Sequence, residues 1–313
     1  MMSRFLKTTK NKIIAAAIAA VVLFCLVIEL GQLVPSLGIP SWNELLSMVG
    51  LAEPYVVPEG ELQVHFIDVG NADCVLIRQG DCNVLIDAGE RGDGEKISGY
   101  LSNRGVSKLD LVIATHPHAD HIGAMTEVID NIPISRFVMS FMPESATPTS
   151  STYLDMLSAL DAKKIPVDEA TPGTQYSIGT ARLTVLAPLA ESEEANNISV
   201  VTRLTFGDRS FLFMGDAETT VERDLLSSGR PLTADVIKVG HHGSDTSSSQ
   251  AFLSAVKPSV VMIPCGAGNS YGHPHAAALL RMEKTGAKIY RADIHGDVCI
   301  VSDGDSLTVK TQK

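Results

Sequence analysis

Histidine and aspartate residues gather in a few short segments of this 313-residue chain. Seven of its nine histidines fall in three clusters: His116, His118, His121, His241, His242, His273 and His275. The densest cluster, HPHADH, brings three imidazoles and the Asp120 carboxylate into six consecutive positions. Imidazole and carboxylate groups are ligands that zinc, manganese and iron accept in proteins. The clustering therefore predicts a metal centre.

The spacing inside HPHADH predicts two cations rather than one. Alternation directs His116 and His118 to one side, while Asp120 and His121 turn to the other. Two neighbouring cations need a carboxylate between them, and Asp216, at the end of an apolar run, is the candidate bridge. The alternative role of Asp216 is N-cap of the helix that follows it.

Strands and helices must position these side chains. Apolar, β-branched runs that stop at polar or ionisable residues occur at 64–69, 84–86, 109–115, 210–214, 236–239 and 260–264. Helical patterns occur at 94–104, 122–131, 149–162, 218–228, 249–256 and 275–285. Short continuous apolar runs are typical of strands buried on both faces. We therefore expect an α/β (α+β) fold with helices outside the sheets.

Composition excludes a disordered chain, because 45% of the residues are apolar and 19% are charged. The net charge is −11, and four of the 25 basic residues lie within the first twelve positions. The acidic remainder is a poor electrostatic partner for nucleic acid as a whole. Any polyanionic substrate must then be attracted locally, for example by bound metal.

The amino terminus predicts a membrane anchor. Residues 1–12 are basic, and residues 13–34 are almost entirely apolar, long enough to cross a bilayer. The positive-inside rule places 1–12 in the cytoplasm and the rest outside, as a single-pass protein of the cell membrane. A signal peptide whose cleavage yields a secreted protein, and a buried soluble helix, are the alternatives. Residues 35–60 read as a proline-containing linker and 61–313 as the folded domain.

The motifs resemble a known family. HPHADH at 116–121 resembles the HxHxDH motif of metallo-β-lactamase fold hydrolases, and LIDAG, FMGDAE and KVGHHGS match its other motifs in order. The segments IDVGNADCVLI, YGHPH and GDVCIVSDG are similar to the hydrolase domain of the ComEC/Rec2 competence proteins. The resemblance runs from about Val64 to Asp303.

This resemblance implies a four-layer αββα sandwich with two divalent ions, zinc or manganese, at one edge, and hydrolysis of a phosphoester, with DNA as candidate substrate. It implies that His116 and His118 hold the first ion and that Asp216 bridges. Asp120 and His121 would hold the second ion with one histidine of the 241–242 pair. We favour His242 as that ligand, which leaves His241 as a hydrogen-bonding catalytic neighbour.

Two departures from the family pattern matter. No histidine occurs from 122 to 215, where the wider fold usually supplies a further ligand. Asn196, Asn197 and Ser199 stand there instead, so Asn197 and Ser199 are candidate contacts of the first ion or the substrate. The multi-span channel of the competence proteins is absent, so a transport role does not carry over.

Other polar residues receive candidate roles. We expect Asp87, in LIDAG, to orient a ligand histidine or the attacking water, or else to serve as a turn residue. His273 is a candidate for binding phosphate or protonating the leaving oxygen, against a capping or surface role. Asp68 and Ser244 are candidate cleft residues, although Ser244 equally fits an N-cap loop. His65 is expected in the core.

Three classes of function remain open. The first is a membrane-tethered phosphodiesterase or nuclease on the outer side of the membrane, in which two cations activate water for attack on phosphorus. The second keeps the metals but cleaves a cell-wall phosphoester, such as phosphocholine or a teichoic-acid linkage, or a lactone or thioester. The third is a non-catalytic binding module on the same fold.

Overall fold

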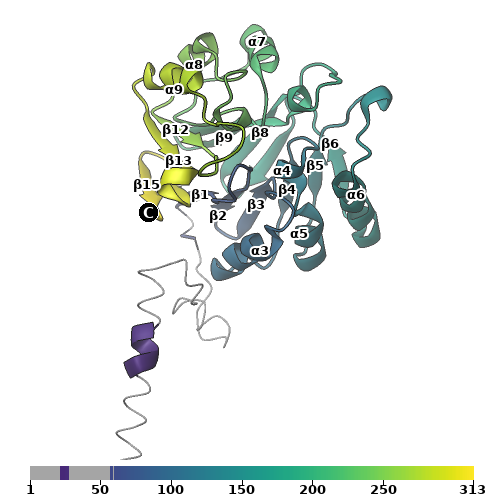
Figure 1. Cartoon of the computed structure of the whole chain (residues 1–313), viewed down its shortest axis with the longest axis vertical. Helices are drawn as coiled ribbons and strands as arrows, with labels where there is room; N and C mark the ends of the chain where they lie inside the picture. The colour runs from purple at the N-terminus through teal and green to yellow at the C-terminus, as the bar shows by residue number, and fades with distance from the viewer. Residues whose placement is uncertain (1–21, 28–56, 59) are drawn as a thin grey trace, which may run out of the picture. The chain divides into compact units, whose positions relative to one another are not determined.

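The computed structural model describes residues 22–27, 57–58 and 60–313. The chain divides into two units, residues 1–55 and 56–313. The second unit holds two β-sheets with helices outside them (Figure 1).

Both sheets are mixed. The first follows the order β15-β14-β1-β2-β3-β4-β5-β6, and the second β13-β12-β11-β10-β9-β8-β7. The strands of the first sheet are β1 (Leu62–Phe66), β2 (Val75–Gln79), β3 (Cys82–Ile86), β4 (Leu111–Ala114), β5 (Phe137–Met139), β6 (Val167–Glu169), β14 (Val298–Ser302) and β15 (Leu307–Thr311). Those of the second are β7 (Gln175–Ile178), β8 (Ala181–Ala187), β9 (Val201–Phe206), β10 (Arg209–Phe213), β11 (Val236–Lys238), β12 (Val260–Ile263) and β13 (Lys288–Arg291).

The core lies in three layers because the strands alternate. On β10, Phe211 and Phe213 enter the cluster between the sheets, whereas Leu212 faces the helices of the second sheet. On β3, Val84 and Ile86 face the other sheet and Leu85 faces outward. Each such large apolar side chain contributes about 1.5–3 kcal/mol on burial. Both faces of these strands are therefore apolar, which explains their continuous apolar runs.

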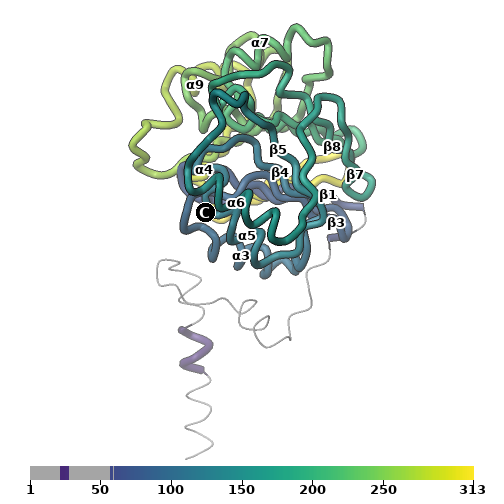
Figure 2. The backbone as a smooth tube through the Cα atoms, turned by 90° about the vertical axis from the view of Figure 1, so that its right-hand side faces the viewer, coloured from purple at the N-terminus to yellow at the C-terminus, as the bar shows by residue number. Residues whose placement is uncertain are grey.

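Helices cover the two outer faces. The first sheet is covered by α3 (Gly94–Asn103), α4 (Ala119–Ile122), α5 (Met125–Asn131) and α6 (Ser151–Lys163). The second is covered by α7 (Thr219–Ser227), α8 (Gln250–Val256) and α9 (Ala276–Glu283). Viewed from the side, α7 and α9 lie at one end and α3 and α5 at the other, with the strands between them (Figure 2). Shorter turns are η2 (Glu144–Ala146), η3 (Ala195–Ile198), η4 (His241–Gly243) and α10 (Ala292–His295).

This arrangement confirms the predicted two-sheet αββα sandwich, with two local differences. The strand expected over 64–69 is β1, which ends at Phe66. The helix expected over 122–131 is two helices, α4 and α5, separated at Gly123 and Ala124. Gly123 donates its N–H to the carbonyl of Gly89 at 2.9 Å, and a Cβ on it would lie 2.2 Å from the nitrogen of Arg91. The close approach of two backbones, which only glycine permits, breaks the helix here.

The amino-terminal predictions fall mostly outside the described residues. Of the expected anchor at 13–34, residues 22–27 are described, and they are helical. Within the described parts of the chain, the helices are all too short or too polar to cross a membrane. Most of the expected linker at 35–60 lies outside the description. Each of the five cysteines, all of which are described, is free.

The parallel parts of both sheets define the edge that carries the site. Strands β3 to β6 run parallel in one sheet, and β10 to β13 run parallel in the other. The histidine and aspartate clusters directly follow β3, β4, β10 and β11. Polar side chains at the carboxyl ends of parallel strands commonly form binding sites, because the strands end together there.

Candidate metal centre

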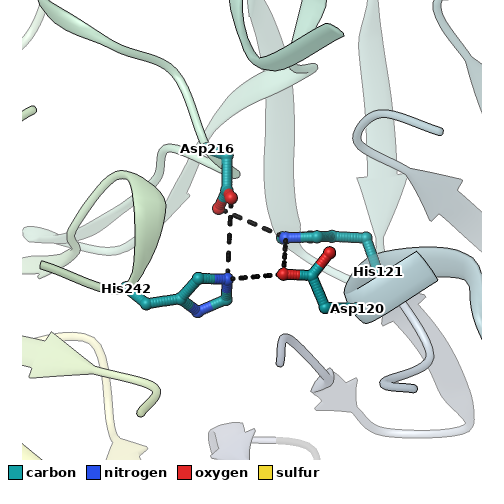
Figure 3. Close-up of side chains that lie close together, drawn as sticks. All are labelled: Asp120, His121, Asp216 and His242. Atoms are coloured by element: carbon teal, nitrogen blue, oxygen red, sulfur yellow. Dashed lines mark ion pairs between the residues drawn. The ribbon is translucent and has the colours of Figure 1, made fainter. Parts of the chain in front are cut away.

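Four side chains from both sheets converge at this edge. Asp120 and His121 lie on α4 after β4, Asp216 follows β10, and His242 lies in η4 after β11. His121 Nε2 is 3.2 Å from Asp216 Oδ1, and His242 Nε2 is 3.3 Å from Asp120 Oδ2 and 3.5 Å from Asp216 Oδ2. Figure 3 shows the four side chains pointing toward one another. This group is called the second site below.

The chemistry of the second site fits a divalent cation. His121 Nε2, His242 Nε2 and Asp216 Oδ1 are buried and have no hydrogen-bond partner. Buried polar atoms without partners are rare and require an explanation. Ligands placed tetrahedrally at 2.0–2.1 Å from zinc lie about 3.3–3.4 Å apart, close to the separations found here. The four side chains therefore form a ligand set for a metal ion.

The other ring nitrogen of each second-site histidine is held by the protein. His121 Nδ1 lies 2.8 Å from Asp87 Oδ2, and His242 Nδ1 lies 2.9 Å from the carbonyl oxygen of Pro264. Donation from Nδ1–H to these oxygens leaves Nε2 as the metal-facing nitrogen. Asp87 is itself fixed, because it accepts bonds from the Thr115 N–H at 2.8 Å and the Thr115 hydroxyl at 2.7 Å.

A second group of ligand atoms surrounds the other oxygen of Asp216. His116 Nε2 lies 3.9 Å and His241 Nε2 lies 3.8 Å from Asp216 Oδ2, and His116 Nε2 is 3.1 Å from His118 Nδ1. Asp216 thus lies between two groups of imidazoles, as a bridging ligand would. We refer to His116, His118, His241 and Asp216 as the first site.

His241 lies between Glu218 and Asp216. Its Nδ1 is 3.2 Å from Glu218 Oε1 and its Nε2 faces Asp216. Metal-binding imidazoles are commonly oriented by a carboxylate at one ring nitrogen, which leaves the other nitrogen to face the metal and its ligands. His241 therefore is a candidate third imidazole of the first site, in a chain with no histidine from 122 to 215.

The backbone explains how two consecutive histidines reach two sites. His241 and His242 both have left-handed conformations, with φ of 49° and 50°. Such φ values are costly for residues with a Cβ and cluster at functional sites. The tight turn sends the two adjacent rings in different directions, with an interplanar angle of 69°.

Electrostatics favour ionised carboxylates at the centre. Burial disfavours the charge on Asp216, but the charges of His121 and His242 outweigh it and hold the pKa of this carboxyl well below its usual range. Burial likewise opposes protonation of His121, yet Asp216 and the other carboxylates beside it raise the pKa of its imidazole well above the ordinary value. Burial and the neighbouring His121 lower the pKa of His116. A cation bound by His121 would displace a proton, so metal uptake releases protons.

The remaining predicted residues are placed as follows. Ser199 accepts the Asp216 N–H at 3.1 Å, so it supports the bridging residue. His273 has its ring centroid 5.4 Å from that of His241, and its Nδ1 is buried without a partner. Its ring therefore lies beside the first site, and its role as a substrate contact stays a prediction. Asp87 lies behind His121 and accepts a hydrogen bond from its Nδ1–H, which is the orienting position expected for it.

Of three further candidates, Ser244 and Asp68 bond to other groups, and the buried Oδ1 of Asn197 has no hydrogen-bond partner. The asparagine that contacts His241 is Asn196 and not Asn197, because Asn196 Nδ2 lies 3.4 Å from His241 Nδ1. Ser244 Oγ pairs with the Thr246 hydroxyl at 3.1 Å. Asp68 accepts the Gly70 N–H at 3.2 Å, so its carboxylate closes a turn after β1. The structure records no contact of these three side chains with the ligand atoms.

Sequence reasoning did not identify Lys238. It is 1% exposed, and its Nζ donates to the Gly215 carbonyl at 2.7 Å and pairs with Asp73. A signal existed: β11 places Lys238 on the same face as Val236, which enters the core between the sheets. A lysine at an inward position of a buried strand requires a partner.

A further set of possible ligands, Asp73, Asp87 and His121, lies behind the second site. Most of its atoms already have partners, because Asp87 binds Thr115 and His121, and Asp73 Oδ2 pairs with Lys238. In this group Asp73 Oδ1 has no hydrogen bond, and it lies 3.5 Å from His242 Nδ1. We therefore assign this group to support of the second site and not to another cation.

Comparison with known proteins identifies relatives. A model of the metallo-beta-lactamase superfamily matches residues 67–266. The chain is 29% identical over 268 residues to ComE operon protein 3 of Bacillus subtilis, covering 78% of this chain and 33% of that protein. It is 28% identical over 265 residues to competence protein ComA of Neisseria gonorrhoeae, covering 83% and 35%. The chain thus spans about a third of the length of these relatives.

The fold is also found in a solved structure. CmlA, a diiron β-hydroxylase from Streptomyces venezuelae, aligns with a TM-score of 0.52 and 16% identity, covering 78% of this chain and 54% of that one. At this identity the likeness shows a shared fold alone.

Proposed function

The chain belongs to the metallo-β-lactamase superfamily, and from this membership we propose that it is a dinuclear metal-dependent phosphodiesterase. The matches to competence proteins confirm the resemblance predicted from the motifs. The observation that carries the proposal is the convergence of imidazoles on the two oxygens of Asp216, together with the buried, unpartnered Nε2 atoms of His121 and His242.

The residues of the chain have separate tasks in this proposal. Divalent ions bound here would polarise a phosphoryl oxygen and lower the pKa of a water molecule. Asp87 and the Pro264 carbonyl accept the Nδ1–H of His121 and of His242, so that the unprotonated Nε2 of each ring faces the ions. Asp216 sets the separation of the two sites. His273, with its unpartnered Nδ1, supplies a hydrogen bond to a phosphate or leaving oxygen.

The rim of the centre favours a nucleic-acid substrate. Tyr271 is 65% exposed, and one face of its ring stacks on His273 at a centroid distance of 5.6 Å and an angle of 18°. An open aromatic face stacks readily on a nucleobase. Recognition of choline uses a cage of several rings, whereas Tyr271 offers one free face.

Hydrolysis assays test this proposal. The full chain, purified in mild detergent, should hydrolyse bis-p-nitrophenyl phosphate and thymidine 5′-p-nitrophenyl phosphate, lose this activity on chelation, and regain it with zinc or manganese. Asp216→Asn should abolish turnover, whereas Asp235→Asn, at the opposite end of β11, should retain it. Turnover that survives both chelation and Asp216→Asn would refute the proposal.

Substrate comparison separates the alternatives. Faster turnover of the thymidine ester than of p-nitrophenyl phosphocholine supports a nuclease-like enzyme, and the reverse supports a cell-wall phosphodiesterase. Tyr271→Ala should raise KM for the thymidine ester and leave that for the choline ester unchanged. A chain that binds two ions and turns over neither ester, nor a lactone or thioester, would be a binding module.

The amino terminus adds a proposal about location. We propose that residues 13–34 anchor the chain in the cell membrane with the metal centre outside, on the basis of the basic segment and apolar run. The full chain should then remain with membranes after carbonate extraction, and protease added to intact cells should digest residues 60–313. Release by carbonate would exclude the anchor.

A further inference from the structure

Lys238 is a buried cation within the metal centre. It ends β11, pairs in register with Phe213 on β10 and Met262 on β12, and shares the inward face of those two core residues. It is among the largest fully buried side chains of the described residues. A charged side chain at such a position is stable only when other groups replace its hydration.

Three oxygen atoms surround the Lys238 ammonium. It donates to the Gly215 carbonyl at 2.7 Å, forms an ion pair with Asp73 Oδ2, and lies 3.8 Å from Asp216 Oδ1. The Gly215 carbonyl also accepts the His241 N–H at 3.2 Å. Lys238 thereby anchors the turn, with Gly215 at φ 53°, that delivers Asp216 to both sites.

Asp73 connects this ammonium to the other sheet. It lies between β1 and β2, is 2% exposed, and donates its N–H to the Asp120 carbonyl at 3.1 Å. Its carboxylate lies 3.7 Å from His121 Nδ1 and 3.5 Å from His242 Nδ1. The Lys238–Asp73 pair therefore crosses from one sheet to the other directly behind the second site.

The physical cost of such a pair indicates that it has a specific task. A buried ion pair rarely stabilises a fold more than apolar side chains of the same volume would, because both charges lose their hydration. The surrounding inter-sheet positions of β10, β11 and β12 are occupied by Phe213, Val236 and Met262. Apolar packing is therefore available at this level of the sandwich. What the pair adds is a fixed distance between two segments of the chain. One is the turn at Gly215 and Asp216, and the other is the start of α4 with Asp120 and His121.

We propose that Lys238 is a positioning residue of the second site: paired with Asp73, it holds the Gly215 carbonyl and Asp216 in place so that ligands from the two sheets are spaced for a cation before one binds. The proposal rests on the metal centre proposed above. Lys238 touches no substrate, and its effect passes through Asp216. Its loss should weaken binding of the second-site ion most, because Asp73, its partner, also lies beside His121 and His242. The first-site ion shares Asp216 and the Gly215–His241 contact, so its affinity should fall by a smaller factor.

Metal titration of the full chain tests this. Zinc affinity would be measured by competition with a chromophoric chelator, and zinc content per folded chain by elemental analysis. Lys238→Met keeps the length of the side chain and removes its charge. We expect the affinity for one of the two ions to fall tenfold or more, and that for the other, which shares Asp216, to fall by a clearly smaller factor. Arg209→Met, which removes the ion pair with Asp235 at the opposite end of β10 and β11, is the matched control and should change neither affinity.

A double variant separates positioning from simple stability. Lys238→Met with Asp73→Asn leaves no unpaired buried charge, so the free energy of unfolding without metal should recover toward that of the unsubstituted chain. The affinity for one ion should remain tenfold or more weaker, because the Gly215 carbonyl has lost its anchor. The double variant also serves as the test if Lys238→Met does not fold.

The outcomes are distinct. Unchanged affinities for both ions in either folded variant overturn the role of Lys238. Equal weakening of both ions also overturns it, because the effect is then not strongest at the second site. If the unsubstituted chain binds no zinc, the proposed dinuclear function fails instead.

Discussion

Asp87 offers the sharpest test of how the second site is organised. Its two carboxylate oxygens accept three bonds, from the Thr115 N–H, the Thr115 hydroxyl and His121 Nδ1–H, at 2.7–2.8 Å. Asn in its place has one acceptor oxygen and one NH₂ group. If the amide oxygen faces His121, the NH₂ opposes the Thr115 N–H. If the NH₂ faces His121, the imidazole must accept at Nδ1 and carry its proton on Nε2, toward the metal position.

The magnitude follows from these contacts. A hydrogen bond to a charged group contributes about 1.5–3 kcal/mol, and either orientation of the amide loses at least one such bond. Loss of the partner that orients a metal-binding histidine typically lowers metal affinity about 10–100-fold, or about 1.4–2.7 kcal/mol. We therefore expect Asp87→Asn to bind one zinc ion about 10–100-fold more weakly.

Calorimetric titration of the folded variant with zinc measures this effect. Asp235→Asn is the control, since Asp235 also accepts a backbone N–H, from Ser210 at 2.8 Å, but lies at the end of β11 opposite to the ligands. It should reduce stability without changing zinc affinity. Binding of both ions by Asp87→Asn within twofold of the unsubstituted affinity would refute the reasoning.

Four further measurements follow from the structure. Burial lowers the pKa of His65 from 6.5 to about 3, so the folded state resists protonation of this imidazole. The free energy of unfolding should therefore fall as the pH drops from about 6.5 toward 3, by about 1.4 kcal/mol per pH unit. His65→Gln should flatten this pH dependence in urea titrations. Gly215→Ala should destabilise the chain by about 1–3 kcal/mol, because φ is 53° and the new Cβ lies 3.0 Å from Thr115 Cβ. Phe213→Ala should cost about 3–5 kcal/mol in the same assay, and unchanged stability would contradict its place in the core. Chelation should lower the melting temperature of the unsubstituted chain, with about 2.7 kcal/mol lost relative to zinc at 100 times its dissociation constant.

The layered fold was predictable because its signals are local. Each buried strand is a short apolar run, and each run stops where the ligand-bearing loop begins, so 84–86, 210–214 and 260–264 lie within two residues of β3, β10 and β12. HPHADH was equally readable, since its residues are adjacent in the chain. Asp216 could be inferred only as the carboxylate at the end of another strand.

The parts that could not be predicted depend on contacts between distant segments. The break at Gly123 comes from the backbone of Arg91, which no helical pattern reveals. The separate directions of His241 and His242 come from two left-handed residues in succession. Lys238 matters because Asp73, from the other sheet, meets it.

The order of the ligands along the chain has a consequence for biosynthesis. Asp120 and His121 leave the ribosome long before Asp216 and His242, and the two pairs belong to different sheets. A nascent chain that ends before residue 216 contains two of the four second-site ligands, and one that ends before residue 242 contains at most three. Tight binding of the second-site ion therefore requires that the two sheets have already packed against each other. The bound ion would then link the two halves of the polypeptide.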